Sequence, residues 1–109
     1  VSPAGGRGWG GGVGWVPAAM PVGDEGGAGA RGNAAPLGLG AGGGTHDGAR
    51  QLRMARAIES GQVFVNSYGA GGGVELPFGG VKQSGHGREK GFEALYGFST
   101  LKTIAIKHD

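Results

Sequence analysis

The chain of 109 residues contains no cysteine. This absence excludes disulfides, thiolate metal sites and a cysteine nucleophile from these residues. The sequence also has no run of 18 apolar residues, the signal of a membrane-spanning helix. Its start, Val-Ser-Pro-Ala, lacks the charged and apolar regions of a signal peptide and has no initiator methionine. We therefore expect a soluble, cytoplasmic protein with no membrane partner, truncated at its start.

Positive charges barely outnumber negative ones, and the first part of the chain has few large side chains. The formal net charge is only +2, so the sequence shows no basic patch. Seventeen of the 29 glycines and four of the five prolines fall in residues 1–44. Glycine loses the most backbone entropy on ordering and has no side chain to bury. No window in this segment predicts a helix or a strand, and we expect it to be poorly structured.

Periodic patterns begin immediately after this segment. Thr45 or Asp47 is a candidate N-cap for a helix over residues 48–60, in which apolar residues recur at intervals of three. Gly61 would end this helix as a left-handed cap. The β-branched and aromatic run at 62–66 predicts a buried strand. A helix, a glycine and a strand in this order indicate an α/β fold.

Three further elements are predicted downstream. Residues 67–87 form a long glycine-rich loop, and loops of this length are more often functional than decorative. We expect the side chain of Asn66 to hydrogen-bond to the adjoining loop. Residues 88–96 predict a short helix that carries Arg88 and Glu89 on a solvated or ion-paired face. The alternating residues 101–107 predict an edge strand that needs a partner.

One long motif lies in the glycine-rich loop. Residues 76–91 read Leu-Pro-Phe-Gly-Gly-Val-Lys-Gln-Ser-Gly-His-Gly-Arg-Glu-Lys-Gly, which resembles the PFGGxKxSGxGRExG signature of the aldehyde dehydrogenase superfamily. Residues 59–66 resemble the helix-to-strand turn and the VxVN strand of that family, and residues 101–106 resemble its closing strand. Upstream the resemblance weakens, because glycines stand at family positions that are apolar or acidic: Gly27, Gly29, Gly40, Gly42 and Gly43. Single base changes convert valine or glutamate to glycine, so we interpret this part as decayed or misread.

The resemblance implies an α/β fold, specifically a C-terminal fragment of an aldehyde dehydrogenase-like fold. Residues 1–44 would be a degenerate, weakly family-like segment. Residues 45–98 would form the end of the catalytic domain. Residues 99–109 would form an oligomerisation strand, through which we expect a homo-oligomer.

The reaction implied for the intact parent enzyme is oxidation of an aldehyde to a carboxylic acid with NAD or NADP. In the family an upstream cysteine attacks the aldehyde, and a glutamate-activated water releases the acid. Neither group is present here, and the family's Glu-Ile-Phe-Gly-Pro motif falls on residues 11–15, where only its glycine, Gly14, is retained. We therefore expect no catalytic, cofactor-binding or metal-binding residue in this chain, which we predict to be inactive alone.

By resemblance, two residues are candidates for substrate binding. Phe78 would line the substrate channel, where its ring can pack against an apolar or aromatic aldehyde. The alternative is that Phe78 is only the hydrophobic anchor of its loop. Glu75 could face a polar group of the substrate, or it could be an exposed loop carboxylate.

Other motifs favour different functions. The run at 38–43 fits G-x-G-x-x-G, but no strand is predicted before it, as a dinucleotide site requires. The three histidines are widely separated and lack metal-ligand spacing. The run at 5–11 has the arginine-glycine composition of single-stranded nucleic-acid binders, although its single arginine supplies little phosphate neutralisation. Two alternatives therefore stand beside the enzyme: a nucleic-acid-binding segment and a non-catalytic oligomerisation module.

Overall fold

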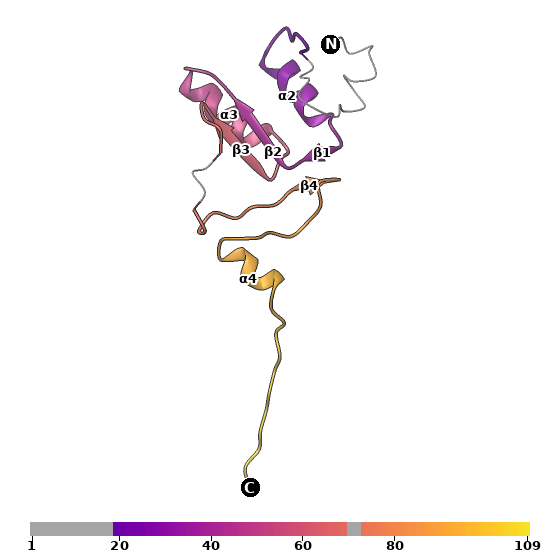
Figure 1. Ribbon diagram of the computed structural model, residues 1–109, viewed down its shortest axis with the longest axis vertical. Coiled ribbons are helices and arrows are strands. Elements are labelled where there is room, and N and C mark those ends of the chain that lie inside the picture. The colour runs from indigo at the N-terminus through magenta and orange to yellow at the C-terminus, as the bar shows by residue number, and fades with distance from the viewer. Residues whose placement is uncertain (1–18, 70–72) are drawn as a thin grey trace.

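The computed structural model of this chain describes residues 19–69 and 73–109. Its elements are α2 (Glu25–Asn33), β1 (Leu37–Gly38), β2 (Gly40–Gly43), α3 (Gly48–Ala57), β3 (Gln62–Val65), β4 (Val81–Lys82) and α4 (Glu93–Gly97), shown in Figure 1. Helices and strands alternate over the first part of the described chain, so the predicted α/β class is confirmed. The runs at 5–11 and 11–15 lie outside the described residues.

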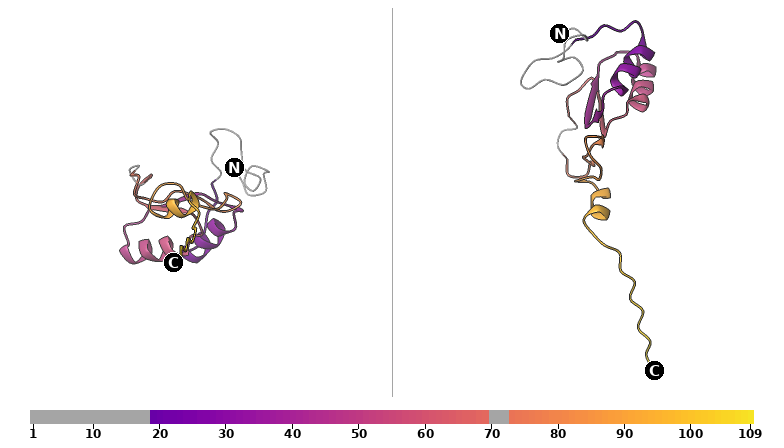
Figure 2. Two further views of the ribbon diagram at one scale, coloured as in Figure 1. Left: turned by 90° about the horizontal axis from the view of Figure 1, so that it is seen from below. Right: turned by 90° about the vertical axis from the view of Figure 1, so that its right-hand side faces the viewer.

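A β-α-β unit forms the upper part of the molecule. β2 and β3 pair in parallel, with Gly40 opposite Gln62 and Gly43 opposite Val65. Parallel neighbours need a long crossover connection, and α3 supplies it here. Helices α2 and α3 lie side by side on the same face of this strand pair, as both views in Figure 2 show.

A second, smaller strand pair connects the signature loop to this unit. β1 pairs antiparallel with β4, with Leu37 opposite Lys82 and Gly38 opposite Val81. Because β1 immediately precedes β2 in the chain, the pairing brings the signature segment to the end of the β-α-β unit. The signature is thus anchored to residues more than forty positions away in sequence.

Helix α3 begins where the sequence predicts and ends earlier. The side chain of Asp47 caps it, accepting hydrogen bonds from the backbone N–H groups of Ala49 and Arg50. The helix stops at Ala57 because Ile58 is extended, with φ −75° and ψ 124°. The predicted cap role of Gly61 is wrong: its N–H donates to the carbonyl of Gly38 and leads the chain into β3. Strand β3 itself matches the prediction, although its residues are half-buried.

The sequence pattern predicts no helix or strand in residues 1–44. That prediction is wrong for residues 25–43, which form α2, β1 and β2. Asp24 caps α2 by accepting a hydrogen bond from the N–H of Gly27, which compensates in part for the helix's many glycines. β2 is held by its backbone pairing with β3, which requires no particular side chain. Tertiary contacts therefore order a segment that local propensity does not favour.

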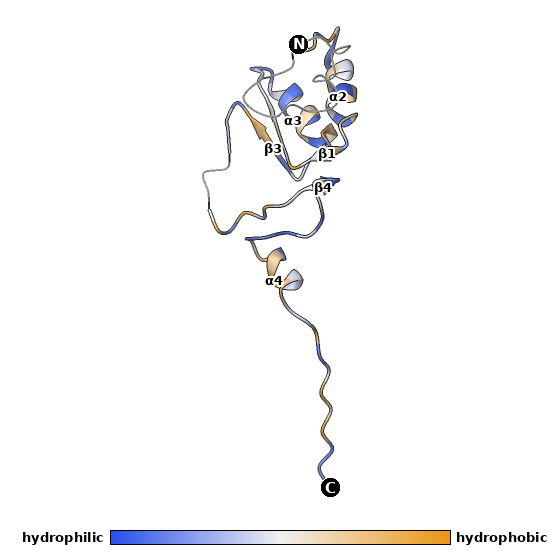
Figure 3. Ribbon diagram, turned by 45° about the vertical axis from the view of Figure 1, so that its right-hand side comes forward, coloured by the Kyte–Doolittle hydropathy of each residue, from blue (hydrophilic) through white to orange (hydrophobic). Residues whose placement is uncertain are grey.

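The last forty residues differ from prediction in two elements. The helix predicted over 88–96 begins only at Glu93, because Lys90 and Gly91 have φ values of 62° and 67°, in the left-handed region. Residues 101–107 form no strand and lie extended away from the other elements (Figure 1). Hydrophobic and hydrophilic segments both occur along this tail, as Figure 3 shows.

The described residues enclose little core. Ala94, 8% exposed, is the buried hydrophobic side chain among them. Within residues 19–69 and 73–109, no helix has the length and apolarity needed to cross a membrane.

Candidate functional site

The signature segment folds back on itself. The backbones of Phe78 and Glu89 exchange two hydrogen bonds, 2.7 and 2.8 Å long, in an isolated antiparallel bridge. Farther out, the N–H of Gly91 donates to the carbonyl of Val74 at 2.7 Å. Residues 74–78 and 89–91 are thus held side by side, with β4 in the connection between them.

Both predicted substrate residues lie on the first arm of this fold-back. Phe78 sits at the bridge, and its side chain is half-buried. Glu75 lies in the turn before it and is exposed. The structure therefore places both residues on one arm, with Phe78 at its fixed end.

Lys82 joins this fold-back to the C-terminal end of α2. Its Nζ donates to the carbonyls of Asn33, at 2.8 Å, and Ala35, at 3.2 Å. It also forms an ion pair with Glu59 at 3.2 Å. The last carbonyls of a helix have no partner within the helix and carry partial negative charge, so an ammonium group is favourable there. Sequence reasoning did not assign this role to Lys82, although the lysine is a fixed letter of the signature.

Ser84 and Arg88 hold the remaining turns. The hydroxyl oxygen of Ser84 accepts a hydrogen bond from the N–H of Gly38 at 2.9 Å. Nη1 of Arg88 donates to the carbonyls of Gly80, at 3.0 Å, and Gly87, at 2.7 Å. The prediction that Arg88 lies on a solvated helix face is therefore wrong: it lies before the helix and clamps two loop carbonyls.

Glycines in and beside the signature stand where another residue would be strained. A Cβ on Gly61 would fall well inside contact distance of the carbonyl oxygen of Gly79, and one on Gly80 would strike Ser84. Gly85 and Gly87 have φ values of 105° and 79°, which side-chain-bearing residues rarely adopt. These glycines therefore have an architectural role.

Two asparagines fix the flanking elements. Asn66 exchanges hydrogen bonds with the backbone of Thr45, both 2.8 Å long, so it ties down the loop before α3 rather than the adjoining loop that the sequence predicts. Asn33 accepts from the N–H of Glu59 at 2.8 Å and donates to the carbonyl of Ala57 at 2.7 Å. Asn33 thereby joins the end of α2 to the end of α3, which draws the chain out of the helix after Ala57.

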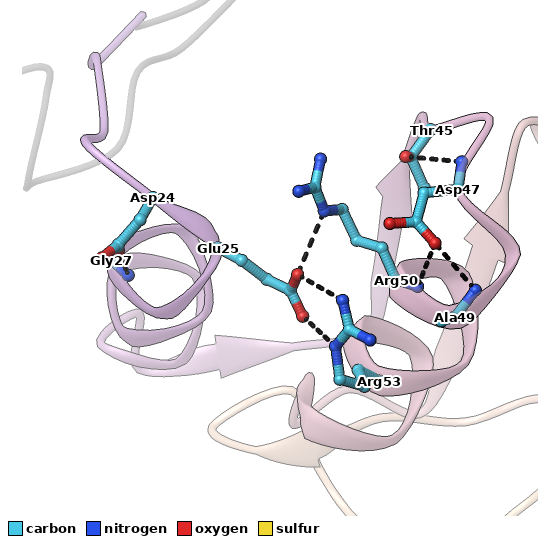
Figure 4. A network of polar contacts seen from close by, with 8 residues as sticks. All are labelled: Asp24, Glu25, Gly27, Thr45, Asp47, Ala49, Arg50 and Arg53. Atoms are coloured by element: carbon cyan, nitrogen blue, oxygen red, sulfur yellow. Dashed lines mark hydrogen bonds and ion pairs between the residues drawn. The ribbon is translucent and has the colours of Figure 1, made fainter.

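An ion-pair cluster joins the other ends of these helices (Figure 4). Glu25 accepts hydrogen bonds from Nε of Arg50, at 3.0 Å, and from Nε and Nη2 of Arg53, at 2.8 and 2.9 Å. The hydrogen bonds from Arg53 lower the pKa of Glu25 from 4.5 to about 2; partial desolvation opposes this, and Arg50 adds to the lowering. The same contact raises the pKa of Arg53. Sequence reasoning missed this cluster because its partners lie on separate helices.

The described residues do not fit a dinucleotide. The glycines at 38–43 belong to β1 and β2 rather than to a phosphate-binding turn. The N-terminus of α3, which follows a parallel strand, is already occupied by the carboxylate of Asp47. A phosphate there would meet a negative charge where free N–H groups are required. Among the described residues, no group of three His, Asp or Glu side chains is arranged to hold a metal ion.

Comparison with known proteins agrees with the signature. The family model described as "Aldehyde dehydrogenase family" matches residues 13–104. The NADP/NAD-dependent aldehyde dehydrogenase PuuC of Escherichia coli (strain K12) is 50% identical over 74 residues, which cover 68% of this chain and 15% of that protein. The chain thus spans less than a fifth of the length of this curated relative.

Solved structures show the same correspondence in three dimensions. A putative aldehyde dehydrogenase from Burkholderia cenocepacia is 70% identical, with a TM-score of 0.69, over 79% of this chain and 18% of that one. HpcC from Thermus thermophilus is 42% identical, with a TM-score of 0.72, over 79% of this chain and 16% of that one. The arrangement of α2, the β-α-β unit and the signature fold-back therefore occurs within much longer chains.

Proposed function

This chain belongs to the aldehyde dehydrogenase family, and on that premise we propose that residues 74–91 form one wall of the aldehyde channel of an enzyme that oxidises an aldehyde to a carboxylic acid. The observation that carries the proposal is the fixed position of Phe78. Two backbone hydrogen bonds hold it at the bridge, and the adjoining turns are tied down by Lys82, Ser84 and Arg88. A rigidly held, half-buried ring suits the wall of an apolar pocket.

The electron acceptor in this proposal is NAD or NADP, because the relative PuuC is an NADP/NAD-dependent aldehyde dehydrogenase. When bound, it would take the hydride from the aldehyde adduct. The chain's own residues supply neither the cysteine nucleophile nor, within the described part, a dinucleotide site. The 109 residues by themselves should therefore produce no reduced cofactor from an aldehyde and NAD or NADP.

We assign the parts of the chain accordingly. Residues 45–98 contribute the end of the catalytic domain, together with β2, which pairs with β3. Residues 99–109 supply a strand to an oligomerisation sheet, so the intact enzyme is a homo-oligomer. The extended form of this tail and the exposure of its apolar side chains support the assignment.

The test is a chimera in which residues 45–98 replace the matching segment of PuuC. In this background, Phe78→Ala should raise KM for benzaldehyde about tenfold, because it removes the ring that contacts the substrate. KM for acetaldehyde should change much less, since a small aldehyde contacts less of the wall. Glu75→Gln serves as the companion variant and reports whether that carboxylate contributes to KM.

The competing explanation, that Phe78 is only a loop anchor, predicts a different effect on the activity with the two aldehydes. If Phe78 only anchors its loop, Phe78→Ala should lower Tm and reduce activity on both aldehydes equally. Phe78→Leu separates the two further, since a leucine anchor would restore stability without restoring the preference for an aromatic aldehyde. Equal loss on both substrates would reject the channel wall.

A further inference from the structure

A hollow of about 1040 Å³ lies between the two helices and the β2–β3 pair. Leu39, Met54 and Ile58 contribute to its walls, together with Val63 and Val65 of β3. Both layers belong to this chain, with the helices on one side and the strands on the other (Figure 2). Neither Phe78 nor any other residue of 74–80 lines it, so it is distinct from the place where Phe78 would contact an aldehyde, although Ser84 of the signature borders it.

Missing side chains create much of this space. In the parallel register Gly43 lies opposite Val65, and adjacent partners share a face of the sheet. A Cβ on Gly43 would meet no atom within 4 Å. Gly42 belongs to the opposite face, where a Cβ would reach the backbone of Phe64 at 4.0 Å. β2 therefore contributes no side chain to the hollow at Gly43.

Most polar side chains around the hollow are already engaged. Gln51 donates to the carbonyl of Thr45, and Ser84 accepts from the N–H of Gly38. At the rim, Glu25 and Arg50 are paired with each other. The hydroxyl of Ser60, which also lines the hollow, is buried without a hydrogen-bond partner. A charged ligand would lose its hydration and gain at most a single neutral hydroxyl as a partner, which is unfavourable. Apolar cavities between packed elements bind benzene-like molecules for the converse reason.

We propose that this hollow is a binding site for a small, uncharged aromatic molecule, held between α2, α3 and the Val63–Val65 face of the sheet. The ring would be buried against the methyl groups of Met54, Ile58 and the two valines. A volume of about 1040 Å³ matches the upper range of small-molecule sites, so a single-ring ligand fits without displacing the helices.

The experiment uses the complete 109-residue chain and fluorobenzene as the probe. Titration is followed by ¹⁹F NMR of the probe and by methyl resonances of the protein. Saturable shifts are expected at Met54, Ile58, Val63 and Val65. Benzoate carries the same ring with a charge and should bind at least about tenfold more weakly. Absence of saturable shifts, or equal affinity for benzoate, would overturn the proposal.

Matched variants locate the site. Gly43→Ile places a branched side chain in the hollow beside Val65 and should raise the Kd for fluorobenzene at least about tenfold. Gly42 borders the hollow through its backbone, but its Cβ would lie on the other face, so Gly42→Ile should leave the Kd unchanged. Ala55→Leu fills the space from α3 and gives an independent test if Gly43→Ile does not fold. Unchanged binding in a folded filling variant, or equal loss in Gly42→Ile, would reject this location.

Discussion

At the scale of single residues, Glu25 shows how one carboxylate can join two helices whose own sequences are weak. It lies in the first turn of α2, where negative charge is favourable, and it accepts hydrogen bonds from two arginines one turn apart on α3. The shared contact makes the stability of the helix pair dependent on its ionisation.

We expect this contribution to depend on pH in a defined direction. The pKa of Glu25 is about 2 when folded and 4.5 ordinarily, so the unfolded chain binds a proton more readily. The stabilisation is complete above pH 4.5 and is lost as pH falls toward 2. Urea unfolding at pH 6 and pH 3 should therefore show a smaller pH dependence for Glu25→Gln than for the unmodified chain.

A second carboxylate on another helix is the control for this pH effect. Glu93 begins α4 and makes no ion pair among the described residues. Glu93→Gln should leave the difference between pH 6 and pH 3 unchanged. A Glu25→Gln variant that keeps the full pH dependence would show that the two arginines do not carry it.

At the scale of elements, α2 is limited by its own composition. Gly29 is buried in this helix, yet a Cβ there would meet no atom within 4 Å. Gly29→Ala should therefore stabilise the chain by about 1 kcal/mol, because alanine loses less backbone entropy in a helix. Denaturant unfolding followed by circular dichroism at 222 nm measures the change.

The same substitution at a different glycine should destabilise the chain instead. Gly61→Ala places its Cβ against the backbone of Gly79, and a backbone cannot rotate away as a side chain can. We expect a clear loss of stability for this variant. Stabilisation by both substitutions, or by neither, would contradict the packing described for α2 and β3.

Elements with a local signal were predictable, and elements made by distant contacts were not. The cap at Asp47 and the strand β3 follow from nearby residues, whereas the partner of Asn66, Thr45, is distant in sequence. α2 and β2 were not predictable, because their glycine-rich sequences are ordered by other elements. The roles of Lys82 and Arg88 were missed for a different reason: they donate to backbone carbonyls, which leave no pattern in the sequence.

At the scale of the whole molecule, the tail is an extended segment with exposed apolar side chains. Leu101, Ile104 and Ile106 are 94%, 73% and 74% exposed. An extended segment of this kind presents unpaired backbone groups and apolar side chains together, which favours pairing with another chain. We therefore expect the chain to self-associate through residues 101–107.

Sedimentation velocity over a range of concentrations tests this expectation. Replacing both Ile104 and Ile106 by lysine should shift the chain to monomer, because like charges would face each other across the paired strands. Thr103→Lys changes the other face and should have less effect. Concentration-independent monomer in the unmodified chain would refute association through the tail.

The hydrogen-bond partners of the signature side chains determine which substitutions elsewhere in the chain the signature can tolerate. Lys82, Ser84 and Arg88 all bond to main-chain atoms, at Asn33, Ala35, Gly38, Gly80 and Gly87. A mutation that changes a side chain on the receiving side leaves its carbonyl or N–H in place. Apart from the ion pair of Lys82 with Glu59, the signature therefore needs no matching side chain elsewhere, and it can persist while the residues around it are replaced.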